Sequence, residues 1–131
     1  MAFNILIVDD SPAMRRMIRR VVDLSGVDLG TCLEAGNGRE ALAVLRSKWV
    51  DIVLTDINMP EMNGEELVIE LRKDDALSTV PVLVVSTDQS ASRIDRMMSH
   101  GANGYLPKPF LPGELCSEMH RLLGGPSDES F

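Results

Sequence analysis

Apolar runs and amphipathic helical stretches alternate five times along the 131 residues, and this alternation limits the fold more than any other feature. The run VPVLVVS at 80–86 is apolar almost without interruption, which is typical of a strand buried on both faces of a sheet. Four more strands are expected at 3–10, 31–35, 51–56 and 104–108. Strands and helices in alternation give a parallel sheet covered on both faces by right-handed crossover helices. We therefore expect a single doubly wound α/β domain with a five-stranded sheet and five helices, which suits a chain of this length.

Capping residues and apolar periodicity mark the helices. Ser11 precedes a proline, and Asn37 and Asn63 each stand three residues before a glutamate, as in a capping box. Apolar residues then recur at helical spacing, and the second helix is expected to reach Trp49. The methionines expected to face the core are Met14, Met17, Met97 and Met98.

Polar side chains end four of the five expected strands. Asp9 and Asp10 end the first strand, Asp56 the third, Ser86 the fourth and Lys108 the fifth. In an open parallel sheet, ligands bind at the carboxyl ends of the strands, where the strand order reverses. We therefore expect these side chains to gather at one site.

Three neighbouring carboxylates repel one another, by about 4 kcal/mol for each pair at ~4 Å and an effective dielectric constant of ~20. Protonation of one carboxylate or a divalent cation would relieve the repulsion. Oxygen ligands of this kind favour Mg²⁺, and a lysine with a hydroxyl beside them suits a phosphoryl group on one aspartate. Taken singly, each residue has an ordinary alternative as a helix-terminal acid, a turn residue, a loop residue or a surface charge. Only their combination indicates this chemistry.

Five segments resemble the response-regulator receiver family, also called CheY-like. They are LIVDDS (6–11), EAGNGREAL (34–42), DIVLTDINMPEMNG (51–64), PVLVVST (81–87) and GANGYLPKPF (101–110). The resemblance implies the strand order 2-1-3-4-5 of the flavodoxin-like fold. It also implies a receiver domain at 1–123, followed at 124–131 by a tail or the start of a linker.

The resemblance implies a role for each acidic residue. Asp56 would accept the phosphoryl group. Asp10 and Asp56 would bind Mg²⁺ directly, together with the backbone carbonyl of Asn58, and Asp9 would hold the ion through water. Lys108 would pair with the phosphoryl group.

Two further residues would form the switch of such a domain. Ser86 would bind the phosphoryl group and move on activation, and Tyr105 would then turn inward. The alternative for Tyr105 is an ordinary half-exposed strand residue. Thr87 stands where the family usually has a smaller side chain, which puts the phosphoryl lifetime in question.

Composition narrows the choice of partner and compartment. A net charge of −7 disfavours a wide nucleic-acid interface, because phosphate binding needs a basic surface. No apolar run approaches the ~18 residues of a membrane span, and the N-terminus lacks the features of a signal peptide. Cys32 and Cys116 lack metal-ligand spacing and are expected to be reduced. We therefore expect a cytoplasmic protein that binds neither nucleic acid nor membrane.

The preferred function is a two-component receiver that takes phosphate from a histidine kinase or phosphotransfer domain and controls a downstream target protein. It would be a stand-alone, chemotaxis-type regulator, or a receiver cut from a longer DNA-binding or enzymatic regulator. Its only reactions would be its own phosphorylation and dephosphorylation, and it would be a monomer that could dimerise on activation. One alternative is a magnesium-dependent phosphohydrolase with an aspartate nucleophile, although such enzymes carry a second acid where Asn58 stands. Another is an interaction module that works without phosphate.

Overall fold

The computed structural model describes residues 2–124, in which five strands and five helices alternate. The strands are β1 (Phe3–Val8), β2 (Leu29–Ala35), β3 (Ile52–Thr55), β4 (Val82–Ser86) and β5 (Gly104–Pro107). The helices are α1 (Pro12–Asp23), α2 (Gly38–Ser47), α3 (Gly64–Lys73), α4 (Ala91–Ser99) and α5 (Pro112–Leu122). All strand pairs are parallel and the order is β2-β1-β3-β4-β5, which confirms the predicted doubly wound fold. The expected tail lies, from residue 125 onward, outside the described residues.

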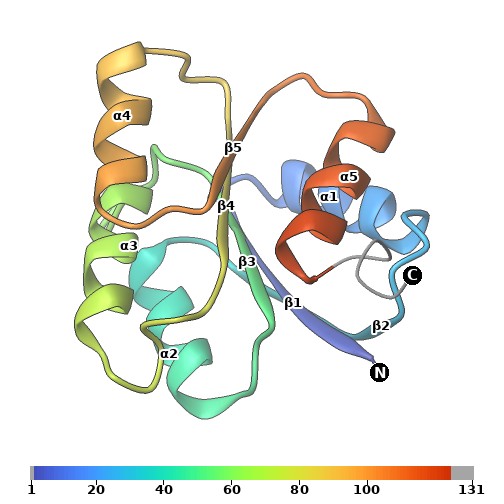
Figure 1. The fold of residues 1–131 in the computed structure, drawn as a ribbon, viewed down its shortest axis with the longest axis horizontal. Helices are drawn as coiled ribbons and strands as arrows, with labels where there is room; N and C mark the ends of the chain where they lie inside the picture. The colour runs from blue at the N-terminus through green and yellow to red at the C-terminus, as the bar shows by residue number, and fades with distance from the viewer. Residues whose placement is uncertain (1, 125–131) are drawn as a thin grey trace.

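The sheet is the middle layer between two layers of helices (Figure 1). Successive residues of a strand point to opposite faces of the sheet. Leu6 and Val8 therefore lie in the core beneath α2, α3 and α4, whereas Ile5 and Ile7 lie in the core beneath α1 and α5. All four side chains are almost completely buried, which explains why the central strands are continuous apolar runs.

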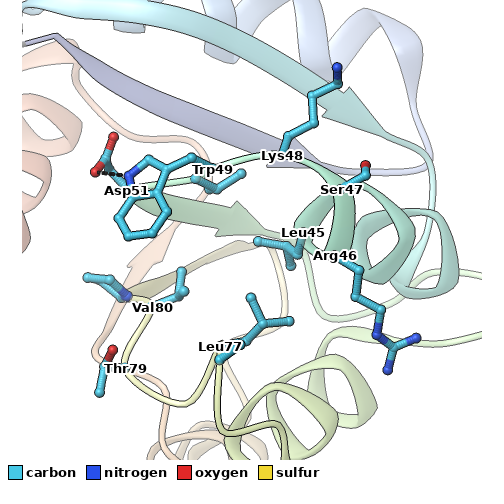
Figure 2. Close-up of a pocket in the computed structure, with 12 residues that line it drawn as sticks. Leu45, Arg46, Ser47, Lys48, Trp49, Asp51, Leu77, Thr79 and Val80 are labelled. Atoms are coloured by element: carbon cyan, nitrogen blue, oxygen red, sulfur yellow. Dashed lines mark hydrogen bonds between the residues drawn. The ribbon is translucent and has the colours of Figure 1, made fainter.

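Helix α2 ends at Ser47, so the prediction that it reaches Trp49 is wrong. The backbone is already extended at Lys48, and Trp49 is 76% exposed. The indole nitrogen donates a hydrogen bond of 2.9 Å to Asp51 Oδ1, and Asn4 Nδ2 donates one of 3.1 Å to the Trp49 carbonyl. These contacts hold Trp49 beside a hollow of about 420 Å³ at the amino ends of β3 and β4 (Figure 2), away from the carboxyl ends.

The prediction for the methionines holds for half of them. Met97 is buried and Met14 packs against the core, but Met17 is 39% exposed and Met98 is 42% exposed. Successive helical residues lie 100° apart around the axis, so Met17 falls beside the buried position of Ile18, and Met98 falls beside that of Met97.

No helix among residues 2–124 is both long enough and apolar enough to cross a membrane.

Arg72, near the end of α3, ties this helix to two loops. Its Nε and Nη2 atoms donate to the carbonyl oxygen of Gly101, at 3.1 and 2.7 Å. Nη1 donates to the carbonyl of Val80 at 2.9 Å, and Nη2 also reaches Asn103 Oδ1 at 2.9 Å. Burial lowers the pKa of the guanidinium. The four hydrogen bonds replace the water that the buried charge has lost.

We expect Arg72→Lys to lower the free energy of unfolding by about 1–3 kcal/mol, because an ammonium group cannot reach the same carbonyls and leaves some without a donor. Urea denaturation followed by circular dichroism measures the loss. The control is Lys73→Ala, because Lys73 is exposed and pairs with Glu70 at the surface. An Arg72→Lys protein as stable as wild type would contradict this role.

Candidate functional site

The acidic residues lie at the carboxyl edge of the sheet, where the strand order reverses between β1 and β3. Asp9 and Asp10 follow β1, and Asp56 follows β3. Sheet-like hydrogen bonds continue beyond both strands, from Asp9 N to the Ala35 carbonyl (3.1 Å) and from Asp56 N to the Val8 carbonyl (2.9 Å). One carboxylate oxygen from each acid lies within 4.8 Å of the others. The structure therefore brings together the three acids that the sequence singled out.

Lys108 supplies a positive charge beside these acids. Its Nζ atom lies 3.0 Å from Asp9 Oδ2 and 3.6 Å from Asp56 Oδ2, and the residue is only 7% exposed. The Lys108 N–H donates to the Ser86 carbonyl at 2.9 Å, and the Lys108–Pro109 peptide bond is cis. One ammonium against three carboxylates leaves the site negative, which favours a divalent cation.

The three acids differ in how many of their oxygens are already bonded. Asp9 is buried, and its Oδ1 accepts from Ser11 N at 2.9 Å while its Oδ2 accepts from Lys108. Asp10 is exposed. Asp56 Oδ1 accepts from Ile57 N at 2.7 Å, yet its side chain remains 15% exposed. Asp10 and Asp56 are thus the acids open to an ion or a small reagent.

Two glycines place the loop that follows Asp56. Gly64 N donates to the Ile57 carbonyl at 2.8 Å, and a Cβ at position 64 would lie 2.2 Å from the Asp56 carbonyl oxygen. Gly38 N donates to the Met62 carbonyl at 2.8 Å, and a Cβ at position 38 would lie 2.7 Å from the Met62 side chain. The loop therefore packs directly on the start of α2 and α3, and no larger residue fits at either contact.

Both expected switch residues bond to the backbone of Asp88, in the loop after β4. Ser86 is completely buried, and its Oγ accepts from Asp88 N at 3.1 Å. The Tyr105 hydroxyl donates to the carbonyl oxygens of Asp88 and Ser86, the latter at 3.3 Å. Burial raises the pKa of Tyr105, and the negative charges of Asp88 and Asp56 raise it further. The phenol therefore stays protonated and able to donate at neutral pH.

The side chain of Asn58 is engaged by a residue that no sequence pattern predicts. Arg93 Nη1, from α4, donates to Asn58 Oδ1 at 3.0 Å and lies 3.4 Å from Asp88 Oδ2. Asn58 and Arg93 are 35 positions apart, so helical or strand spacing cannot relate them. The sequence feature nearest to this contact is the run of polar residues after Ser86, which indicates a loop but no partner for Asn58.

Comparisons with known proteins find relatives of this chain in sequence and in fold. The family model described as the response regulator receiver domain matches residues 5–120. The chemotaxis protein CheY homolog of Campylobacter jejuni is 37% identical over 127 residues, which are 96% of each chain. The structure of chemotaxis protein CheY4 of Vibrio cholerae has a TM-score of 0.84 at 32% identity, and the match covers 94% of this chain and 100% of that one. The phosphorylated cyanobacterial phytochrome response regulator RcpA has a TM-score of 0.78 at 27% identity, over 95% of this chain and 91% of its own.

The crowding of three carboxylates around one lysine predicts opposite effects of Asp10→Asn without and with a divalent ion. Without the ion, we expect the variant to be more stable than wild type, because one repulsive charge is gone. With Mg²⁺ at ten times its Kd, we expect wild type to gain about 1.4 kcal/mol, and the variant much less. Urea unfolding in EDTA and in magnesium chloride measures both effects.

The matched control is Asp95→Asn, which removes the same charge from an exposed position on α4. We expect it to respond to Mg²⁺ as wild type does. An equal magnesium response from Asp10→Asn would show that Asp10 does not hold the ion.

Proposed function

This chain belongs to the response regulator receiver domain family, and we propose that it is a phosphorylation-controlled switch in which Asp56 accepts the phosphoryl group. Receiver domains are signalling proteins that interact with histidine kinases and with downstream targets. The observation that carries the proposal is the position of Asp56, which is partly open to solvent, next to two other acids and 3.6 Å from the ammonium group of Lys108. The match to a phosphorylated response regulator supports the same chemistry.

In the proposed reaction, a carboxylate oxygen of Asp56 attacks the phosphorus of a phosphohistidine. An O–P bond forms, the P–N bond of the donor breaks, and the imidazole nitrogen keeps the bonding electron pair. Transfers of this type depend mainly on positioning and on neutralising the charge of the phosphoryl oxygens. We propose Lys108 for this role, and its Nζ, 3.0 Å from Asp9 Oδ2 and 3.6 Å from Asp56 Oδ2, supports the assignment.

The donor set suits Mg²⁺, which prefers oxygen ligands and retains several waters. Asp10, Asp56 and the backbone carbonyl of Asn58 would hold the ion. Asp9 would act through water, which agrees with the protein hydrogen bonds that both of its oxygens already accept. When bound, Mg²⁺ would neutralise negative charge on the phosphoryl oxygens.

We infer that phosphorylation shifts the population between two conformations. In the proposed active form, the Ser86 hydroxyl binds the phosphoryl group and Tyr105 turns inward. The face formed by α4, β5 and α5 would then change its affinity for the target. A chemotaxis-type target is favoured because relatives that match almost end to end are named as chemotaxis proteins.

The phosphohydrolase alternative is disfavoured by Asn58. An enzyme of that class needs an acid at this position to protonate the leaving group. An amide cannot serve as that acid, and here its oxygen already accepts from Arg93.

We expect wild-type protein, incubated with Mg²⁺ and acetyl phosphate, to gain the mass of one phosphoryl group, and Asp56→Asn to gain none. Intact-protein mass spectrometry measures the change. Asp95→Asn is the control, because it loses the same charge outside the site and should be labelled like wild type.

If wild type gains nothing while another receiver is labelled under the same conditions, the module that works without phosphate is the better description. Steady release of alcohol from a phosphomonoester would instead favour the phosphohydrolase.

A further inference from the structure

Arg15 connects three elements beside the acidic site. It lies near the start of α1, and its side chain is only 19% exposed. Its Nη1 atom donates to the backbone carbonyl of Asp9, just after β1, at 2.6 Å, and its Nε atom donates to Glu34 Oε1, on β2, at 2.8 Å. One guanidinium can serve both acceptors because its nitrogens are held in a rigid plane. Arg15 therefore joins the end of β1 to β2 and to α1.

The carbonyl that Arg15 binds belongs to the peptide group between Asp9 and Asp10. A peptide group is planar, so a bond to its oxygen limits the rotation of the whole unit. The same segment is held on the Asp9 side, because Asp9 N donates to the Ala35 carbonyl at 3.1 Å. Asp10 is exposed, and one of its carboxylate oxygens lies within 4.8 Å of one from Asp9 and one from Asp56. The position of the Asp10 carboxylate thus depends on a backbone that Arg15 helps to hold.

Arg15 also carries a positive charge toward a site that suits a cation. By Coulomb's law alone, this charge weakens the binding of a divalent ion, and its removal strengthens that binding. A role in holding the Asp10 backbone has the opposite effect, because its loss weakens binding. The two effects differ in sign, so the direction of the change in Mg²⁺ affinity tells which of them dominates.

We propose that Arg15 is a positioning residue for the magnesium site, which holds the peptide group between Asp9 and Asp10 so that the Asp10 carboxylate stays within reach of Asp56. This inference rests on the proposed function, because Mg²⁺ is the ion that the phosphoryl transfer would use. A ligand that is already in place loses less conformational freedom when the ion binds. Residues that orient metal ligands without touching the metal contribute roughly 10–100-fold to affinity.

Arg15→Met removes the guanidinium and keeps an unbranched apolar side chain of similar length. We expect the Kd for Mg²⁺ to rise about tenfold, although the site of the variant carries more negative charge. Titration of ¹⁵N-labelled protein with magnesium chloride measures the Kd, from the amide signals of residues 9–11 and 56–58 in ¹H–¹⁵N spectra.

Arg16→Met is the matched control. Arg16 is the next residue of α1, but it lies about 100° further around the helix and is exposed. The variant loses the same charge without losing the bond to the Asp9 carbonyl. We expect it to bind Mg²⁺ at least as tightly as wild type.

Arg15→Lys separates the geometry of the guanidinium from its charge. The single ammonium group keeps the charge but cannot reproduce two donors at the spacing that Nε and Nη1 have. We expect its Kd for Mg²⁺ to lie between those of wild type and Arg15→Met. Urea unfolding of all the variants without Mg²⁺ measures their stability separately, since a purely structural role would lower stability without weakening Mg²⁺ binding by the folded protein.

An Arg15→Met protein that binds Mg²⁺ as tightly as wild type, or more tightly, would overturn the positioning role and leave the proposed function intact. If Arg15→Met does not fold, Arg15→Lys decides the matter by the same criterion. Wild-type protein whose amide signals at residues 9–11 and 56–58 ignore Mg²⁺ would overturn both the role of Arg15 and the proposed magnesium site.

Discussion

The ammonium group of Lys108 lies between the carboxylates of Asp9 and Asp56, where Asp9 is 2% exposed and Lys108 is 7% exposed. Charges so poorly solvated persist only when they are closely paired, since removing one partner leaves the other charge buried and uncompensated. This pairing connects positions that are 99 residues apart, and so fixes the end of β5 relative to the end of β1. It also neutralises only part of the negative charge, because Asp10 and Asp56 still face the same edge. The remaining negative charge makes this edge of the sheet suitable for a cation.

The parallel sheet fixes the positions of these side chains. The backbone bonds of Asp9, Asp56 and Lys108 each continue the pattern of the adjacent strands. The strands are held from both faces by almost fully buried residues, so they cannot rotate or slide without opening the core. The loops beyond them are constrained less, by single contacts such as those of Gly38 and Gly64. The sheet therefore fixes Asp9, Asp56 and Lys108 from both faces, whereas the loops depend on a few close contacts.

Features of the fold that depend on local periodicity can be predicted from the sequence. Unbroken apolar strands and acids at strand ends predict the sheet and the cluster at its edge, because the parallel arrangement leaves those side chains nowhere else to lie. The prediction that α2 includes Trp49 is wrong, because Trp49 bonds instead to Asp51 and Asn4, which lie outside the helix. The contacts of Arg72 and Arg93 could not be predicted from the sequence, since only the tertiary fold brings their partners near. The roles of Ser86 and Tyr105 came from the resemblance to a family, because a serine and a tyrosine at strand positions have no distinguishing pattern.

Ser86 and Tyr105 lie on neighbouring strands, yet they are coupled through the backbone of one residue in the following loop. The N–H of Asp88 bonds to the hydroxyl of Ser86, and its carbonyl accepts from the hydroxyl of Tyr105. Asp88 thus links the two side chains through its backbone. The Asp88 side chain extends the same coupling to α4 through Ser90 N, at the start of the helix, and through Arg93. A continuous path of hydrogen bonds thus runs from the buried hydroxyl of Ser86 to the first turn of α4.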